Sequence, residues 1–230
     1  MYKACVFDLD GTTLYTVEAI RYSISKAILI FGYPQVNEEE TKTFIGDGSR
    51  TMIERAMKWA NNDYDEERIE KAYQEYIRIF KENCMRDVRP YDGLVGILTK
   101  MRVDGLKLGI ISNKPDARTK DNIYGTYGRY FFDVVYGERE GIPLKPAPDG
   151  IINALDELGV KPEDTLYFGD SDMDMNAGRA AGCTTVACLW GYRPREVLEK
   201  CNPDYEQAYS ITSKNGETVN ASFVINAAGV

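Results

Sequence analysis

Apolar positions open the chain as a short strand and continue as a helix. Residues 3–8 (KACVFD) form an apolar run that ends on an aspartate, which is typical of a buried strand. Residues 17–31 (VEAIRYSISKAILIF) then have a helical character, and Gly32 and Pro34 form a stop signal after them. The pattern therefore predicts one strand that is followed directly by a helix.

A further helix is predicted from Asp65 to about Cys84. Asp65 is a residue type that caps helices at their N-terminus. Five apolar or aromatic residues recur after it at three- and four-residue spacing, and so line one helix face: Ile69, Tyr73, Tyr76, Ile77 and Phe80. We expect an amphipathic helix here.

Strand-like and helix-like stretches alternate after residue 88. The order is helix 94–101, strand 107–112, helix from 116, strand 134–137, helix from 148, strand 165–169, helix 175–182 and strand 184–189. Such alternation predicts an α/β fold, a doubly wound, Rossmann-like parallel sheet with helices on both faces.

The helical block after the first strand interrupts this alternation. We therefore expect residues 1–14 and 84–230 to form the Rossmann-like core, and residues 15–83 to form an inserted helical domain. The tail after Asn202 has a weaker pattern, in which residues 214–217 (KNGE) suit the turn of a hairpin.

Charge and composition limit the classes of function. The 230 residues include 28 Lys plus Arg against 36 Asp plus Glu, a net charge of −8, which disfavours nucleic acid and anionic membranes as partners. There is no His, so His-based zinc sites and imidazole bases are excluded, and a carboxylate is the expected acid or base.

Five Cys without a CxxC pair favour neither a disulfide framework nor a thiolate metal site. No apolar run suits a signal sequence or a membrane span, so we expect a cytoplasmic protein.

Two aspartates follow the first predicted strand in the stretch FDLDGT. Asp8 and Asp10 are two residues apart, so in an extended chain both carboxylates can face one pocket. Gly11 would allow the sharp turn that a loop near a ligand requires. A simple Asp-Gly-Thr turn explains the same residues equally well.

Two later stretches also lie at the carboxyl ends of predicted strands, where open α/β sheets bind ligands. IISNKP contains Ser112 and Asn113, which suit a phosphoryl oxygen, although taken alone they are better explained as an ordinary cap of the next helix. LKPAPDG contains Lys145 between two prolines, either as a cation for phosphate or as an ordinary surface lysine.

A cluster of acidic residues follows the predicted strand 165–169. In GDSDMD, Asp170, Asp172 and Asp174 lie so close together in sequence that their charges need compensation, which a divalent cation would supply. Acidic residues are also preferred at a helix N-terminus, but this preference accounts well for one aspartate and poorly for three.

The order and placement of these four motifs resemble the haloacid dehalogenase superfamily, from FDLDGT through GDSDMD. Residues 15–83 resemble its helical cap domain, and the stretches FIGDGSRTMIERAM and WGYRPREV resemble the phosphoglycolate phosphatase branch. The resemblance implies a Mg²⁺-dependent phosphatase that acts on a small phosphorylated metabolite, as a monomer or homodimer.

The resemblance also implies roles for the acidic residues. Asp8 would be the nucleophile that forms an aspartyl phosphate, and Asp10 would protonate the leaving oxygen and later activate water. Mg²⁺ would bind the carboxylates of Asp8 and Asp170 and the backbone carbonyl of Asp10. Asp174 would lie in or just behind the metal's ligands and order its waters.

The remaining implied roles concern phosphate and substrate. Ser112, Asn113 and Lys145 would hold the phosphoryl oxygens. In the cap, the loop with Gly46, Gly48 and Arg50 is the candidate for recognising the leaving group. Arg50 would be equally at home on a helix surface.

One position departs from the superfamily's pattern, and several other activities stay open. Tyr15 stands where the family usually has Asp or Asn. The hinge contacts or the environment of the leaving group therefore differ from the family's pattern. The alternatives are a pyrophosphatase, a nucleotidase, or a sugar-phosphate phosphatase or mutase, although such a mutase usually has a cap His. Asp10 disfavours a dehalogenase. A phosphonate hydrolase would need a desolvated cap lysine, and the candidate Lys26, on an amphipathic helix, is better explained as a solvated residue. A receiver-type signalling module carries similar groups but has no inserted cap.

Overall fold

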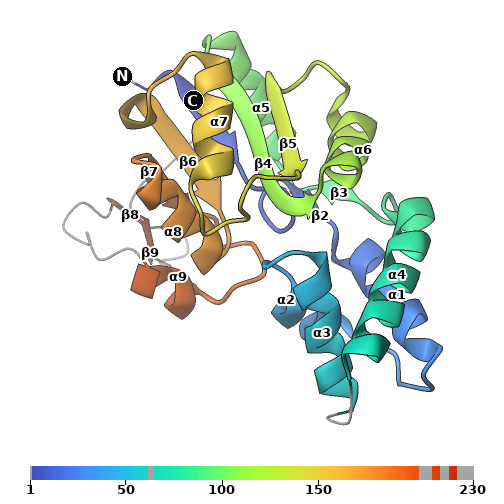
Figure 1. Cartoon of the computed structure of the whole chain (residues 1–230). Coiled ribbons are helices and arrows are strands. Elements are labelled where there is room, and N and C mark those ends of the chain that lie inside the picture. Colours follow the sequence, from blue (N-terminus) through green and yellow to red (C-terminus); the bar gives the residue numbers. More distant parts are fainter. Residues whose placement is uncertain (1, 62–64, 202–208, 213–217, 222–230) are drawn as a thin grey trace.

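A five-stranded parallel sheet forms the centre of the computed structural model (Figure 1), which describes residues 2–61, 65–201, 209–212 and 218–221. The strand order is β5-β4-β1-β6-β7. The strands are β1 (Ala4–Phe7), β4 (Lys107–Pro115), β5 (Val134–Glu138), β6 (Thr165–Gly169) and β7 (Thr184–Ala187). The first strand of the chain is therefore the central one, and it pairs in parallel with β4 and β6.

Helices cover both faces of this sheet, as an α/β doubly wound fold requires. The helices are α5 (Leu94–Val103), α6 (Asp116–Tyr127), α7 (Asp149–Leu158) and α8 (Asp172–Ala180). Cys5 and Phe7 pack with α5 and α6, whereas Val6 between them packs with α7 and α8. Because successive strand residues face opposite sides, one apolar strand supplies both cores. The predicted fold class is confirmed.

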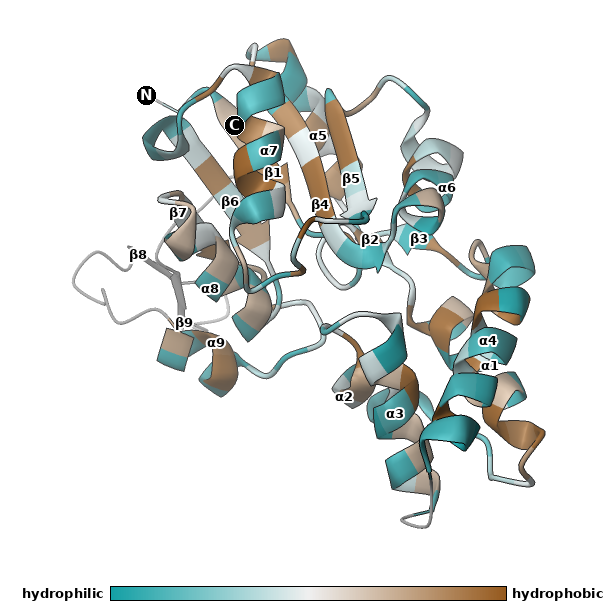
Figure 2. Cartoon of the chain, viewed as in Figure 1, coloured by the Kyte–Doolittle hydropathy of each residue, from teal (hydrophilic) through white to brown (hydrophobic). Residues whose placement is uncertain are grey.

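Four helices after the first strand form a separate unit with its own apolar core. They are α1 (Val17–Leu29), α2 (Glu38–Phe44), α3 (Ser49–Ala60) and α4 (Glu66–Asn83). Asp65 caps α4 as predicted, because its carboxylate accepts a hydrogen bond from the Arg68 N–H at 2.8 Å. Figure 2 shows hydrophilic and hydrophobic residues interleaved along α3 and α4, as expected for amphipathic helices.

The two connections between the sheet and the helical unit lie side by side. The short strands β2 (Leu14–Tyr15) and β3 (Arg89–Pro90) pair in antiparallel fashion there. The Arg89 guanidinium lies 4.0 Å from the centre of the Tyr15 ring. Tyr15, which departs from the pattern that the motifs resemble, is thus part of this two-stranded connection.

Several details differ from the sequence prediction. β4 continues to Pro115, beyond the predicted end at residue 112, because it pairs with β5 again after an irregularity between Ile111 and Pro115. α9 (Arg195–Cys201) was not predicted. The tail contains β8 (Tyr209–Thr212) and β9 (Thr218–Ala221), which pair in antiparallel fashion, while the predicted turn at residues 214–217 lies outside the described residues.

Among the described helices, none has both the length and the apolar character of a membrane span.

Candidate active site

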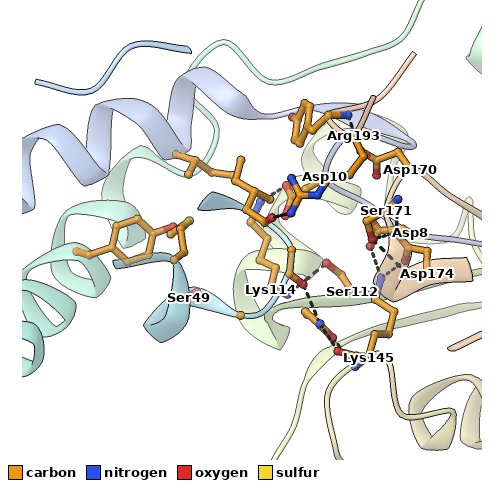
Figure 3. Close-up of a pocket in the computed structure, with 18 residues that line it drawn as sticks. Asp8, Asp10, Ser49, Ser112, Lys114, Lys145, Asp170, Ser171, Asp174 and Arg193 are labelled. Atoms are coloured by element: carbon orange, nitrogen blue, oxygen red, sulfur yellow. Dashed lines mark hydrogen bonds and ion pairs between the residues drawn. The ribbon is translucent and has the colours of Figure 1, made fainter. Parts of the chain in front are cut away.

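The carboxyl ends of β1, β4 and β6 meet at one pocket, which the helical unit closes from the other side (Figure 3). Asp8 follows β1, Asp170 follows β6, and Ser112 lies near the end of β4. Lys145 comes from the loop between β5 and α7. The central position of β1 therefore brings together the motifs that the sequence separates by more than a hundred residues.

Lys145 forms a buried ion pair with two carboxylates. Its Nζ lies 2.6 Å from Asp8 Oδ1 and 2.6 Å from Asp174 Oδ1, and it donates to the Ile111 carbonyl at 3.2 Å. Burial alone would lower the pKa of Lys145, but the carboxylates of Asp174 and Asp8 outweigh it and hold that pKa well above its usual value. Lys145 is therefore a charged ammonium, not the solvated surface lysine that was the alternative.

Asp8 is destabilised as an anion by its surroundings. Burial raises its pKa well above the usual value, against the opposing charge of Lys145, and the neighbouring Asp174 and Asp170 raise it further. The second oxygen, Oδ2, has no hydrogen-bond partner among the described residues. One oxygen of Asp8 is thus fixed by Lys145 while the other is available for chemistry.

Asp174 uses both of its oxygens within the protein. Oδ1 accepts from Lys145 and, at 3.2 Å, from the Tyr167 hydroxyl, while Oδ2 accepts from the N–H of Ser171 at 3.1 Å. The hydroxyl of Ser171 also donates to Oδ2 at 2.5 Å, and its oxygen caps α8. These four donors hold Asp174 against Lys145, and they leave its carboxylate close enough to Asp8 and Asp170 to contribute to a cation site.

Asp170 lies in a cradle of backbone and small residues. Thr12 donates its hydroxyl hydrogen to Oδ1 at 3.0 Å, and the Tyr192 N–H donates to Oδ2 at 2.6 Å. A Cβ on Gly11 would lie 2.3 Å from Oδ2, and one on Gly191 would lie 2.1 Å from the Asp170 Cβ, so only glycine fits at either position. Burial, with the nearby charge of Asp174, raises the pKa of Asp170 to about 7.

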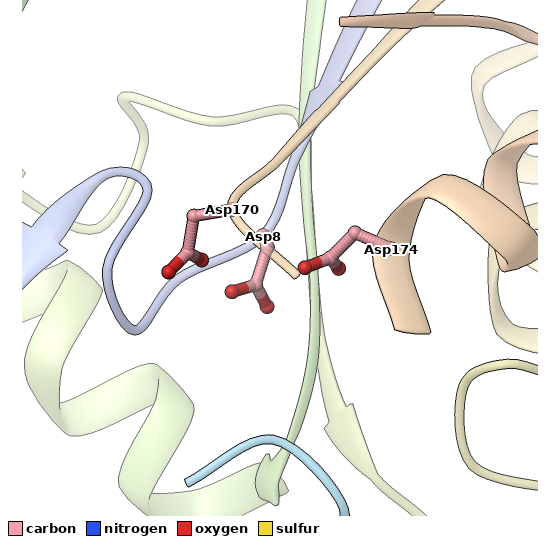
Figure 4. A group of neighbouring side chains, drawn as sticks. All are labelled: Asp8, Asp170 and Asp174. Carbon is pink, nitrogen blue, oxygen red and sulfur yellow. The ribbon is translucent and has the colours of Figure 1, made fainter. Parts of the chain in front are cut away.

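The carboxylates of Asp8, Asp170 and Asp174 fit a divalent cation (Figure 4). One oxygen from each lies within 4.8 Å of the others, and all three side chains are buried. Their oxygens are the ligands that hard cations such as Mg²⁺ prefer. A cation would stabilise the charged form of Asp8 and Asp170, whose pKa is raised by burial and, to a smaller extent, by the neighbouring carboxylates.

Asp10 has a different environment from Asp8, although both face the pocket as predicted. Its Oδ1 accepts from Lys114 Nζ at 2.6 Å and from the Thr16 hydroxyl at 2.5 Å. The Tyr192 hydroxyl accepts from the Thr16 N–H at 3.0 Å and so extends this network. Asp10 is thus held at the side of the pocket nearest the helical unit.

Ser112 and Asn113 also lie in the pocket wall. The Ser112 Oγ accepts from the Lys114 N–H at 3.2 Å. The Asn113 amide donates to the carbonyls of Lys145 at 3.0 Å and Gly46 at 2.9 Å, and its oxygen accepts from the Lys145 N–H at 2.8 Å. Asn113 therefore fixes the backbone of the lysine loop and also contacts the helical unit.

The three cap residues singled out in the sequence separate in the structure. Gly46 and Gly48 line the pocket. Arg50 does not line it, and instead pairs with Glu66 and, at 3.6 Å, with Glu70 on α4. Its side chain is 42% exposed, so the structure matches the alternative interpretation of a helix-surface residue.

Three further pocket residues lie within the sequence motifs, although the sequence predicted no role for them. Lys114 belongs to IISNKP, and Tyr192 and Arg193 belong to WGYRPREV. Arg193 donates to the backbone carbonyls of Lys42, at 2.7 Å, and of Ile45 in the helical unit. Their membership of these motifs was the only signal in the sequence, because their partners lie in distant segments.

Comparisons with known proteins agree with this architecture. The family model described as haloacid dehalogenase-like hydrolase matches residues 5–188. A phosphoglycolate phosphatase of Haemophilus influenzae is 29% identical over 209 residues, covering 89% of this chain and 93% of that protein. The phosphoglycolate phosphatase of Escherichia coli is 27% identical over 219 residues, covering 88% and 87%. The crystal structure of a predicted phosphoglycolate phosphatase from Haemophilus somnus superposes with a TM-score of 0.81 at 26% identity, covering 88% and 92% of the two chains.

Proposed function

The chain belongs to the haloacid dehalogenase-like hydrolase family, and we propose that it hydrolyses a small, phosphoglycolate-like phosphate monoester through a phosphorylated Asp8. The observation that carries this proposal is the meeting of Asp8, Asp10, Lys145 and Asp170 in one pocket at the strand ends. In this proposal residues 1–14 and 84–230 are the catalytic core and residues 15–83 are the cap. The enzyme would work in the cytoplasm as a monomer or homodimer.

Asp8 would act as the nucleophile. Its free oxygen would attack phosphorus, the bond from phosphorus to the leaving oxygen would break, and an aspartyl phosphate would form. Lys145, which holds the other oxygen of Asp8, would orient the carboxylate and, together with Ser112 and Asn113, stabilise charge on the phosphoryl oxygens. Catalysis would thus depend on positioning and on charge neutralisation.

Asp10 would transfer the protons. In the first step it would protonate the leaving oxygen, so that the alcohol departs neutral. In the second step it would take a proton from the water that attacks the aspartyl phosphate, which releases inorganic phosphate and restores Asp8. The hydroxyl of Thr16 and the ammonium of Lys114 hold its carboxylate in place for both steps.

Mg²⁺ is the cofactor that we propose for this site. The carboxylates of Asp8 and Asp170 and the backbone carbonyl of Asp10 would hold it, with Asp174 behind them. When bound, it would supply positive charge that balances the buried carboxylates and the phosphoryl oxygens.

Phosphate release from 2-phosphoglycolate in the presence of Mg²⁺ tests the proposal. Asp8→Asn should lower turnover at least about 1,000-fold, because the amide cannot form the aspartyl phosphate. Asp104→Asn, on the surface near Lys100, is the matched control and should keep wild-type turnover. Chelation should abolish activity, Mg²⁺ should restore it, and Ca²⁺ should inhibit because its larger, looser coordination misplaces the reacting groups.

A panel of other phosphate esters identifies the substrate class. Pyrophosphate, a mononucleotide and a hexose phosphate should be turned over less efficiently than 2-phosphoglycolate. Activity of Asp8→Asn within a few-fold of wild type would contradict the mechanism, and a strong preference for another member of the panel would contradict the substrate.

A further inference from the structure

The cap side of the pocket carries hydrogen-bond donors that the protein does not use. Ser49, in the first turn of α3, lines the pocket, is 8% exposed, and has no side-chain hydrogen bond to any described residue. Tyr76 of α4 also lines it, is 2% exposed, and its hydroxyl likewise has no hydrogen-bond partner in the described part of the chain. Burial, with the charge of Asp10, raises the pKa of Tyr76 well above its usual value, so this hydroxyl stays protonated.

The N-terminus of α3 faces the same space and is open. Its N-cap is Gly48, which has no side chain to accept from the first N–H groups, and its first turn has no acidic residue. The Met52 N–H is the first to bond within the helix, to the Gly48 carbonyl at 3.1 Å. The earlier N–H groups and the positive end of the helix dipole therefore favour a negative group in front of Ser49.

Lys114 adds a cation with donors to spare (Figure 3). Its side chain is 4% exposed, and its Nζ contacts Asp10 at 2.6 Å and lies 5.1 Å from the centre of the Phe80 ring. Lys145, in contrast, uses its ammonium on Asp8, Asp174 and a backbone carbonyl. An ammonium has three N–H donors, so Lys114 can bind a ligand without giving up Asp10.

We infer that Ser49, Tyr76, the α3 N-terminus and Lys114 form a subsite for a second anionic group of the substrate, and that they determine its specificity. This inference rests on the proposed phosphatase function. The second group is a carboxylate in the proposed substrate class. A neutral leaving group would leave the buried donors and the ammonium poorly paired, which costs binding.

The position of Lys114 also limits the length of the substrate. Lys114 touches Asp10, and Asp10 is the group that the proposed mechanism places at the leaving oxygen. An anion that reaches Lys114 is therefore joined to the leaving oxygen by a short link. One methylene carbon separates the carboxylate from that oxygen in phosphoglycolate, so the two groups can bind side by side.

The test compares 2-phosphoglycolate with 2-hydroxyethyl phosphate, which replaces the carboxylate by a neutral group of similar length. Wild type should prefer phosphoglycolate. Ser49→Ala and Tyr76→Phe should each lower kcat/KM for phosphoglycolate about 10- to 100-fold more than for the neutral ester, mainly through KM. Tyr130→Phe, on a side chain that is 85% exposed, is the control for Tyr76→Phe.

Lys114→Met is the third variant, with the exposed Lys100→Met as its control. It should shift the preference in the same direction, and circular dichroism should confirm that each variant is folded. Equal losses for the two esters in Ser49→Ala and Tyr76→Phe, or no wild-type preference, would overturn the subsite while the phosphatase function stands. Hydrolysis of neither ester would instead overturn the proposed function. A preference for pyrophosphate with the same variant losses would support an anion subsite that takes phosphate rather than carboxylate.

Discussion

Removing the buried cation at the centre of the site should destabilise the fold as well as the reaction. Lys145 Nζ lies 2.6 Å from both Asp8 and Asp174, and the three side chains are 5%, 9% and 1% exposed. Lys145→Met keeps a side chain of similar length and removes the charge, which leaves two buried carboxylates close together without the ammonium that pairs with both. Loss of one partner from a buried ion pair costs about 3–5 kcal/mol, and we expect a loss in this range at pH 7.

The loss should depend on pH in a defined direction. In the variant, burial and the neighbouring carboxylates hold the pKa of Asp8 above its unfolded value of about 3.9, without Lys145 to oppose them. When the pKa of a carboxyl group is higher in the folded than in the unfolded protein, its contribution to the free energy of unfolding is greatest at low pH, where the group is protonated in both. This contribution is lost as pH rises through the folded pKa. The difference between variant and wild type should therefore be smallest near pH 4 and grow toward neutral pH.

Urea unfolding in excess chelator measures this difference, at several pH values between 4 and 8. Mg²⁺ should restore part of the lost stability, because a bound cation takes over part of the compensation of the carboxylates. Lys100→Met is the control, since that side chain is 73% exposed and its loss should change stability by less than about 0.5 kcal/mol. A loss below about 1 kcal/mol at pH 7, or one that does not vary with pH, would refute the reasoning.

Two further variants separate acid catalysis from metal binding. Asp10→Asn should lower turnover of alkyl phosphates about 100- to 10,000-fold. With an aryl phosphate, the variant should release about one equivalent of phenol in a rapid burst, because phenolate leaves without a proton. Turnover should then stall, because the attacking water still needs the base. Equal penalties for alkyl and aryl esters in single-turnover cleavage would remove Asp10 from this role. Gly191→Ala should raise the Mg²⁺ concentration for half-maximal activity about 10- to 100-fold, because the new Cβ would lie 2.1 Å from the Asp170 Cβ and displace that carboxylate. Gly96→Ala, which meets open space, is its control, and an unchanged Mg²⁺ requirement in Gly191→Ala would show that Asp170 does not bind the cation.

Local patterns in the sequence carried much of the fold. The alternation after residue 88 predicted a parallel sheet, and the predicted N-cap at Asp65 is present with its hydrogen bond to Arg68. Helix and strand periodicity and capping depend on residues a few positions apart, so one sequence suffices to recognise them. The helices α2 and α3 were predicted only as part of the helical block 15–83, without separate bounds.

The roles of individual cations could not be assigned in this way. Arg50 and Lys114 both lie in quoted motifs, yet Arg50 pairs with Glu66 on the surface while Lys114 is buried against Asp10. Lys114 and Asp10 are 104 positions apart, and Arg193 reaches carbonyls about 150 positions away. No local pattern encodes such contacts, because the first depends on the pairing of β1 with β4 and the second on how the helical unit packs against the strand ends.

The sequence by itself determined the fold class and the chemical groups of the site. Apolar periodicity set the elements, and Asp8, Asp10 and Asp170 follow the ends of strands, where a parallel sheet exposes its ligand-binding edge, while Lys145 lies in the loop between β5 and α7. Only the tertiary structure decided the strand order that makes β1 central and the pairing of each charge. The reason is physical: secondary structure follows from short-range sterics and hydrogen bonds, whereas a buried charge takes whichever partner the packing of distant segments brings within a few ångströms.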